Sequence, residues 1–103
     1  MIITSTESFV NKTIIDTKGI VTSSIVQSRN IGKDFLSGLK SIVGGELSSY
    51  TEMLEDSKEI ALERITEQAK KKGANAIVGF RFTLTSGQGT SELIAYGTAV
   101  VVE

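Results

Sequence analysis

The stretch that decides the fold is Gly73-Ala74-Asn75-Ala76-Ile77-Val78-Gly79-Phe80-Arg81-Phe82, where a helix gives way to a strand. Lys70-Lys71-Lys72 precede it, at a position where the helix dipole favours cations. Gly73 is a natural residue to end that helix in the left-handed conformation. The side chain of Asn75 is expected to tie down the turn, and the apolar run after it predicts a strand.

Upstream of this stretch, the sequence predicts a helix over residues 46–72. Its apolar residues recur at steps of three and four, namely Leu47, Tyr50, Leu54, Ala61, Leu62, Ile65 and Ala69. Such a helix is about 40 Å long, whereas a compact domain of about 100 residues has a radius of gyration of about 13 Å. The helix therefore spans or overshoots its own domain.

Downstream, residues 75–85 and 92–102 are predicted to form a β-hairpin around Ser86-Gly87-Gln88-Gly89-Thr90. Alternate residues of the last strand point to opposite faces, and both faces are mostly apolar. Helices can cover one face of an antiparallel sheet, but no segment is predicted to cover the other. These observations predict a homo-oligomer.

The first half of the chain is less regular. Residues 2–5 are predicted as a short strand, and residues 12–28 as an extended stretch that Gly19 interrupts as a bulge would. A short helix is expected over residues 33–43, and Gly44-Gly45 then break or hinge the chain. The predicted fold is one α+β domain over residues 1–103, in the order β-β-α-α-β-β, with both helices on one face of an antiparallel sheet.

Composition excludes several classes of function. The 103 residues carry a net charge of -1 and contain no cysteine, histidine or tryptophan. A nucleic-acid site and a catalytic centre built on a nucleophile and a base are therefore not expected. No apolar run is long enough to span a bilayer, and the first residues lack the pattern of a signal peptide. We expect a non-enzymatic protein of the cytoplasm without a bound cofactor.

The best oxygen ligands for a metal lie on the long helix. Four glutamates recur every four residues, namely Glu55, Glu59, Glu63 and Glu67. Like charges at this spacing repel one another by a few tenths of a kcal/mol per pair. One interpretation is an acidic ridge that collects cations, and the other is the solvated face of an amphipathic helix. We favour the solvated face, because the ridge stays on one surface of one helix.

Arg81 stands between Phe80 and Phe82, so its side chain is predicted to leave the strand from the opposite face. One interpretation is an ion pair with a carboxylate such as Glu46 or Glu103, in the same subunit or a neighbouring one. The other is an anion contact that lines a ring. We favour the ion pair, and we take Arg81, Glu46 and Tyr96 as candidates for an interface or an anion contact.

The sequence resembles the YbjQ-like family along essentially its whole length. The resemblance is carried by Gly44-Gly45-Glu46, Tyr50, Leu54, Arg64, Ala69, the stretch 73–79, Arg81 and Ala95-Tyr96-Gly97-Thr98-Ala99-Val100. It implies an α+β subunit similar to those of dodecins, assembled into a ring for which a pentamer is the expected state. The family also carries a heavy-metal-binding label but no catalytic residues.

Four functions are considered for this sequence. The first is an oligomeric binding or scaffold protein whose ligand sits between subunits. The second is an enzyme that works through carboxylates and Arg81, which the lack of histidine and cysteine makes the weaker hypothesis. The third is a metal-binding protein that uses oxygen ligands only, because soft metals prefer the sulfur and imidazole ligands that this chain lacks. The fourth, by analogy with dodecins, is a ring that stores a small-molecule cofactor. No specific biological role can be read from the residues.

Overall fold

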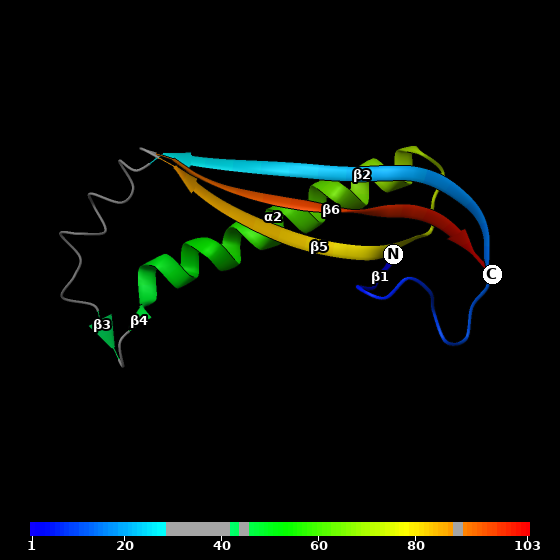
Figure 1. Cartoon of the computed structure of the whole chain (residues 1–103), viewed down its shortest axis with the longest axis horizontal. Helices are drawn as coiled ribbons and strands as arrows, with labels where there is room; N and C mark the ends of the chain where they lie inside the picture. The colour runs from blue at the N-terminus through cyan, green and yellow to red at the C-terminus, as the bar shows by residue number, and fades with distance from the viewer. Residues whose placement is uncertain (29–41, 44–45, 88–89) are drawn as a thin grey trace.

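A four-stranded sheet with one long helix on one of its faces makes up most of the chain (Figure 1). The structure is a computed structural model and describes residues 1–28, 42–43, 46–87 and 90–103. The strands lie in the order β1-β5-β6-β2 and span Ile2–Ile3, Ala76–Gly87, Thr90–Val102 and Ile14–Ser28. The helix, α2, spans Ser48–Lys71. The predicted α+β class is confirmed.

The sheet is mixed, so the prediction of an antiparallel sheet is wrong at one edge. β1 pairs parallel to β5, with Ile2 opposite Ala76, whereas β5, β6 and β2 pair antiparallel as expected. The parallel pairing follows from the path of the chain, since residues 4–13 cross from one edge of the sheet to the other. The register of β2 shifts between Thr17 and Gly19, which confirms the predicted bulge.

The predicted short helix over residues 33–43 lies largely outside the described residues. Its last two residues, Ile42–Val43, form strand β3, which pairs with β4 at Glu46–Leu47. Both residues of β3 are β-branched, a side-chain type that favours strands over helices. The long helix accordingly begins at Ser48, two residues later than predicted.

The end of α2 is closed by the hydrogen bonds of a Schellman motif. The N–H of Gly73 donates to the carbonyl of Lys70 at 2.9 Å, and the N–H of Ala74 donates to that of Ala69 at 3.0 Å. Gly73 has a φ of 83°, in the left-handed region that side chains other than glycine rarely adopt. The predicted left-handed helix end is thus confirmed.

Asn75 ties the chain to β6 immediately after the helix end. Its side-chain amide donates to the carbonyl of Val102 at 2.9 Å and accepts from the N–H of Val102 at 2.8 Å. The amide of the Asn75 side chain therefore pairs with the backbone of Val102 in the way that the backbone of a neighbouring strand would. This confirms the predicted role of Asn75 in the turn and identifies its partner.

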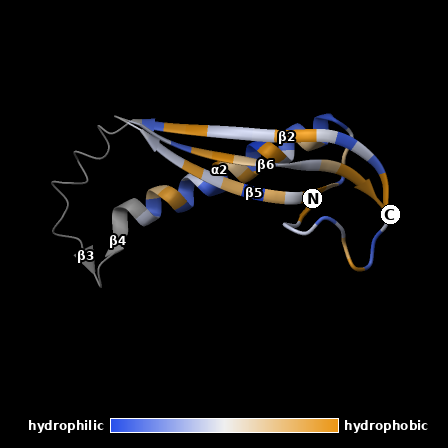
Figure 2. Ribbon diagram, in the orientation of Figure 1, coloured by the Kyte–Doolittle hydropathy of each residue, from blue (hydrophilic) through white to orange (hydrophobic). Residues whose placement is uncertain are grey.

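The main core lies between α2 and the sheet (Figure 2). The helix contributes Ala61, Ile65 and Ala69, which recur every four residues and are fully buried. They pack against Val21, Ile77, Ala95 and Ala99 of the three long strands, and against Ala74. Leu62 and Leu54 of the predicted stripe are half-buried, and the side chains of Leu47 and Tyr50 lie outside the described part. The small alanines let the helix approach the strands closely.

Side chains of α2 also form hydrogen bonds with backbone groups of β2, the strand at one edge of the sheet. The side-chain oxygen of Gln68 accepts a hydrogen bond from the N–H of Thr22 at 2.7 Å. Arg64 donates to the carbonyl of Ser24 at 3.2 Å. These contacts fix the helix across the sheet and satisfy backbone groups that an edge strand otherwise exposes.

The molecule is elongated. Its radius of gyration is 16.7 Å and its extents are 52 × 26 × 18 Å, against the radius of about 13 Å for a compact domain of this size. The first turns of α2 lead away from the sheet toward β3 and β4 (Figure 1). The prediction that the helix overshoots its own domain is confirmed.

Candidate functional site

The N-terminal segment, residues 4–13, covers one end of the sheet face that α2 leaves open. We call this face the outer face. Backbone hydrogen bonds hold the segment against β5: the N–H of Gly79 donates to Thr6 at 2.8 Å, and the N–H of Phe80 donates to Thr4 at 3.0 Å. The side chain of Thr6 in turn donates to the carbonyl of Ser8 at 2.7 Å. The segment is therefore fixed at several successive points.

A second, smaller core forms beneath this segment. Ala76, Val78, Val100 and Val102 are buried on the outer face, with Phe9 and Ile14 packed against them. The prediction that no segment of the chain covers this face is therefore wrong at one end of the sheet. Phe9 supplies that cover from an irregular segment that has no periodic pattern.

The rest of the outer face is open to solvent. Ile20 is 75% exposed, Val26 is 59% exposed and Tyr96 is 40% exposed. Single exposed apolar residues are ordinary, but these three lie on the same face of adjacent strands β2 and β6. The prediction that the last strand has two apolar faces is confirmed, and only part of the outer one is covered.

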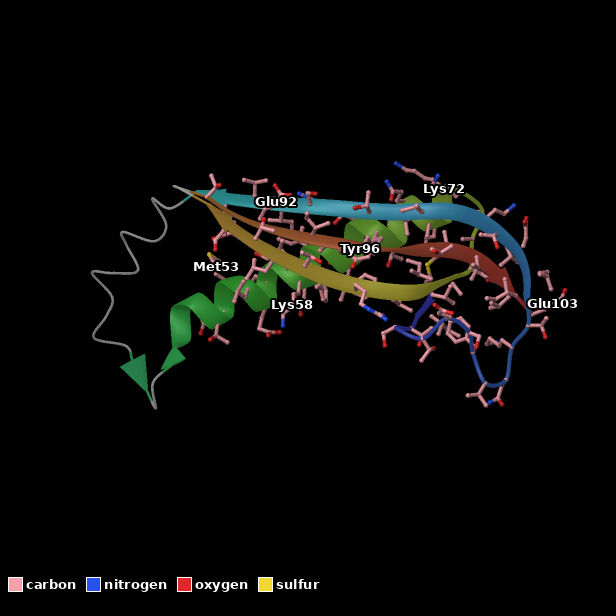
Figure 3. All side chains as sticks on the ribbon, viewed as in Figure 1. Met53, Lys58, Lys72, Glu92, Tyr96 and Glu103 are labelled. Carbon is pink, nitrogen blue, oxygen red and sulfur yellow. The ribbon has the colours of Figure 1, made fainter. Side chains whose placement is uncertain are left out.

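A groove of about 470 Å³ runs along the boundary between the covered and open parts of this face. We call it the boundary groove. Its apolar lining comes from Ile14, Ile20, Val78 and Val100, its aromatic lining from Tyr96, and its polar lining from Glu7, Thr17 and Thr98, together with Gly79 and Gly97. Figure 3 shows the side chains of this region, with Tyr96 labelled on β6.

The β5 strand bulges beside the boundary groove. The register with β6 shifts between Val78 and Arg81, and Gly79 has a φ of 63°. Glycine is favoured there because a side chain at this φ is strained. The bulge turns the N–H groups of Gly79 and Phe80 toward the N-terminal segment, which accepts both hydrogen bonds.

Arg81 lies on the outer face, opposite Tyr96 in the register of β5 and β6. Phe80 and Phe82 meet edge-to-face with their ring centroids 4.9 Å apart, and Phe80 packs against the helix-side core. The predicted orientation of Arg81 is therefore confirmed.

The ion pair that we favoured for Arg81 does not form with any described residue of this chain. Its guanidinium donates to the backbone carbonyl of Ser5 at 2.7 Å and to that of Phe80 at 2.9 Å. The bulge brings the N-terminal segment within reach of the side chain, so carbonyl oxygens take the place of a carboxylate. Arg81 thus anchors the segment that carries Glu7. The side chain of Glu46 lies outside the described part.

The glutamates of the helix do not converge. All four are exposed; Glu55 pairs with Lys58 at 2.6 Å, and Glu67 lies 4.0 Å from Lys70. Among the residues that the structure describes, no group of three or more acidic side chains is placed to hold a metal ion. The glutamates form the solvated face of α2 that we favoured.

Another ion pair lies next to Thr17, a residue of the boundary groove. The ammonium of Lys18 is 2.8 Å from a carboxylate oxygen of Asp16. This hydrogen bond, together with the positive charge of Lys18, lowers the pKa of the exposed Asp16 carboxyl. The two residues that flank Thr17 in the sequence therefore neutralise one another.

The sequence analysis missed Glu7, Ile20 and Thr98 as residues of a common site. Ile20 and Thr98 could have been found from strand alternation, which places them on the face that carries Tyr96. Glu7 gave no such signal, because its position depends on the irregular path of residues 4–13.

The model of the YbjQ family, described as "Putative heavy-metal-binding", matches residues 1–103. The chain belongs to this family. UPF0145 proteins of Bacillus licheniformis and Vibrio parahaemolyticus are 67% and 52% identical to it. The first alignment covers 99% of both chains, and the second covers 97% of this chain and 96% of the relative.

The fold is shared with a solved structure. A crystal structure of a DUF74-family protein of unknown function from Pediococcus pentosaceus matches with a TM-score of 0.66. The match covers 100% of this chain and 98% of the other at 15% identity, so it bears on the fold alone.

The family description does not fit the ligand chemistry of this chain. Heavy and borderline metals are held by thiolate and imidazole, and the sequence contains neither cysteine nor histidine. The four glutamates of α2 are spread along an exposed helix face. We therefore assign no residue as a metal ligand. No described helix is long and apolar enough to cross a membrane.

Proposed function

We propose that this chain is a non-enzymatic binding or scaffold protein that works as a homo-oligomer, with a ligand held where subunits meet. The observation that carries the proposal is the open part of the outer face, where Ile20, Val26 and Tyr96 are exposed on adjacent strands. A second copy of the chain is the simplest cover for such a face.

The shape of the subunit supports assembly as well. The first turns of α2 extend beyond the sheet that its second half covers (Figure 1). Exposed apolar residues also occur on the helix side of the sheet, at Phe82 and Leu84 of β5. A subunit with uncovered apolar surface at both faces gains more from neighbours than a closed globule does.

The number of subunits is proposed on the family resemblance, which implies a ring and most often a pentamer. A ring requires the two contacting surfaces of each subunit to differ, and the outer face and the projecting helix provide two different surfaces. We also propose a cytoplasmic location, on the sequence argument given above.

Sedimentation velocity and native mass spectrometry of tag-free protein test the proposal. We expect a species several times heavier than the 11.0 kDa chain, with five copies as the favoured number. Native mass spectrometry also reports any metal or small molecule that the protein retains. A stable, folded monomer at micromolar concentration would overturn the proposal.

Two matched variants locate the contact. Val26→Asp places a charge on the open part of the outer face, and we expect it to dissociate the assembly without unfolding the subunit. Val10→Asp places the same charge on a fully exposed residue of the N-terminal segment, and the assembly should persist. Equal behaviour of the two variants would argue against the outer face as the contact.

A further inference from the structure

The boundary groove has the chemistry of a small-molecule site. Aliphatic side chains form its floor, and the ring of Tyr96 forms one wall. Its volume of about 470 Å³ falls within the range of roughly 300–1,000 Å³ that is typical of ligand pockets. Three polar side chains, Glu7, Thr17 and Thr98, stand among the apolar lining residues, as in sites where apolar contact gives affinity and a few polar groups fix orientation.

The charge that lines the groove is negative. Among the lining residues that the structure describes, Glu7 is the only charged one. Two cations of the adjoining strands are engaged elsewhere, since Arg81 donates to the carbonyls of Ser5 and Phe80 and Lys18 pairs with Asp16. A ligand in the groove therefore meets one carboxylate that no basic lining residue neutralises.

The backbone on both sides of Glu7 is fixed by contacts with the sheet. Glu7 follows Thr6, whose carbonyl accepts from Gly79, and it precedes Phe9, which packs on the smaller core. Arg81 fixes the carbonyl of Ser5 from the other side. Preorganisation of this kind reduces the entropy that a ligand loses when it binds.

We propose that the boundary groove binds a small organic cation, a protonated amine on a flat apolar body. The ammonium lies at Glu7, and the apolar body lies against Tyr96 and the aliphatic floor. A flat apolar body can stack on the ring of Tyr96, as aromatic pairs do. This inference rests on the binding function proposed above and names the class of its ligand.

Tryptamine is a suitable probe, because it joins a protonated amine to a flat ring system. Titration followed by amide NMR should give saturable shifts at Gly79, Gly97 and Thr98. Indole-3-acetate keeps the ring and reverses the charge, and it should bind at least severalfold more weakly. Absence of saturable shifts up to about 10 mM tryptamine would overturn the proposal. A dissociation constant above about 10 mM corresponds to a binding free energy of less than about 3 kcal/mol in magnitude. Equal affinity for the anion would also overturn it.

Matched variants separate the two contacts. Glu7→Gln should weaken tryptamine binding by up to about fivefold, the range expected for an exposed ion pair. Glu59→Gln removes one carboxylate from the solvated face of α2 and should leave binding unchanged. Tyr96→Phe should retain binding, and Tyr96→Leu should weaken it severalfold. Equal affinities of Glu7→Gln and the parent, or of Tyr96→Leu and Tyr96→Phe, would overturn the assigned contacts.

Sedimentation of the same samples distinguishes this inference from the assembly proposal. An assembled protein that does not bind tryptamine contradicts the inference alone. A monomer that binds it through Glu7 contradicts the assembly and supports the inference, because every residue of the boundary groove comes from one chain.

Discussion

The two faces of the sheet are covered in different ways. On one face, α2 places three fully buried residues against the long strands and closes the main core. On the outer face, the N-terminal segment covers one end with Phe9 and leaves the other end open. A regular helix covers the middle of one face of this sheet, and an irregular segment covers only one end of the other.

The two faces therefore differ in what they contribute to stability and to binding. Under the second half of α2 the helix face buries small and branched apolar residues, whereas Phe82 and Leu84 farther along β5 stay exposed. The outer face keeps a groove where its cover ends, lined by Tyr96 and Glu7 among others. We infer that the helix face supplies most of the folding free energy and that the outer face is available for contacts with other molecules.

The largest expected effect is a cavity on the helix face. Ile65→Ala removes a fully buried side chain from the middle of the main core. We expect it to lower the free energy of unfolding by about 2–5 kcal/mol. Ile60→Ala is the control, because Ile60 lies on the same helix but is exposed. Chemical denaturation should show a much smaller change for the control, and equal losses would contradict the assignment of the core.

The helix face was predictable because its signals are local. Residues at helical spacing predicted the buried stripe of α2, and Gly73 after three lysines predicted the helix end. Alternation along β6 predicted two apolar faces, and both are observed. Each signal depends on residues that are close in the sequence, so no knowledge of the remaining chain was required.

The outer face was not predictable in the same way. The parallel pairing of β1 with β5 and the backbone contacts of Thr4 and Thr6 join segments about 70 residues apart. Backbone hydrogen bonds leave no trace in the pattern of side chains. Strand residues of the boundary groove could be placed on a common face, but Glu7 could not be brought to them. The contacts that Arg81 makes within this chain were missed for the same reason, since their acceptors are backbone carbonyls.

A smaller effect is expected when the cover of the outer face is removed. Phe9→Ala deletes the half-buried ring that packs on the smaller core. We expect a loss of about 1–2 kcal/mol, less than for a fully buried aromatic ring. The neighbouring Val10→Ala should be neutral, since Val10 is fully exposed. Thermal melts of the two variants beside the parent measure the contrast, and a neutral Phe9→Ala would show that the smaller core adds nothing to stability.

The smallest effect is expected at Arg81, which holds the N-terminal segment from the edge of the boundary groove. Arg81→Leu keeps much of the apolar bulk and removes the hydrogen bonds to the carbonyls of Ser5 and Phe80. These carbonyls return to solvent, so the expected loss of stability is only about 1 kcal/mol. Amide exchange should respond more clearly, because the N–H groups of Gly79 and Phe80 donate to the same segment and should exchange faster when it loosens. Arg81→Lys retains a cationic donor and should restore part of the protection. A loss of about 3–5 kcal/mol would instead indicate a buried ion pair formed in the assembly, with a carboxylate of a neighbouring subunit as the partner.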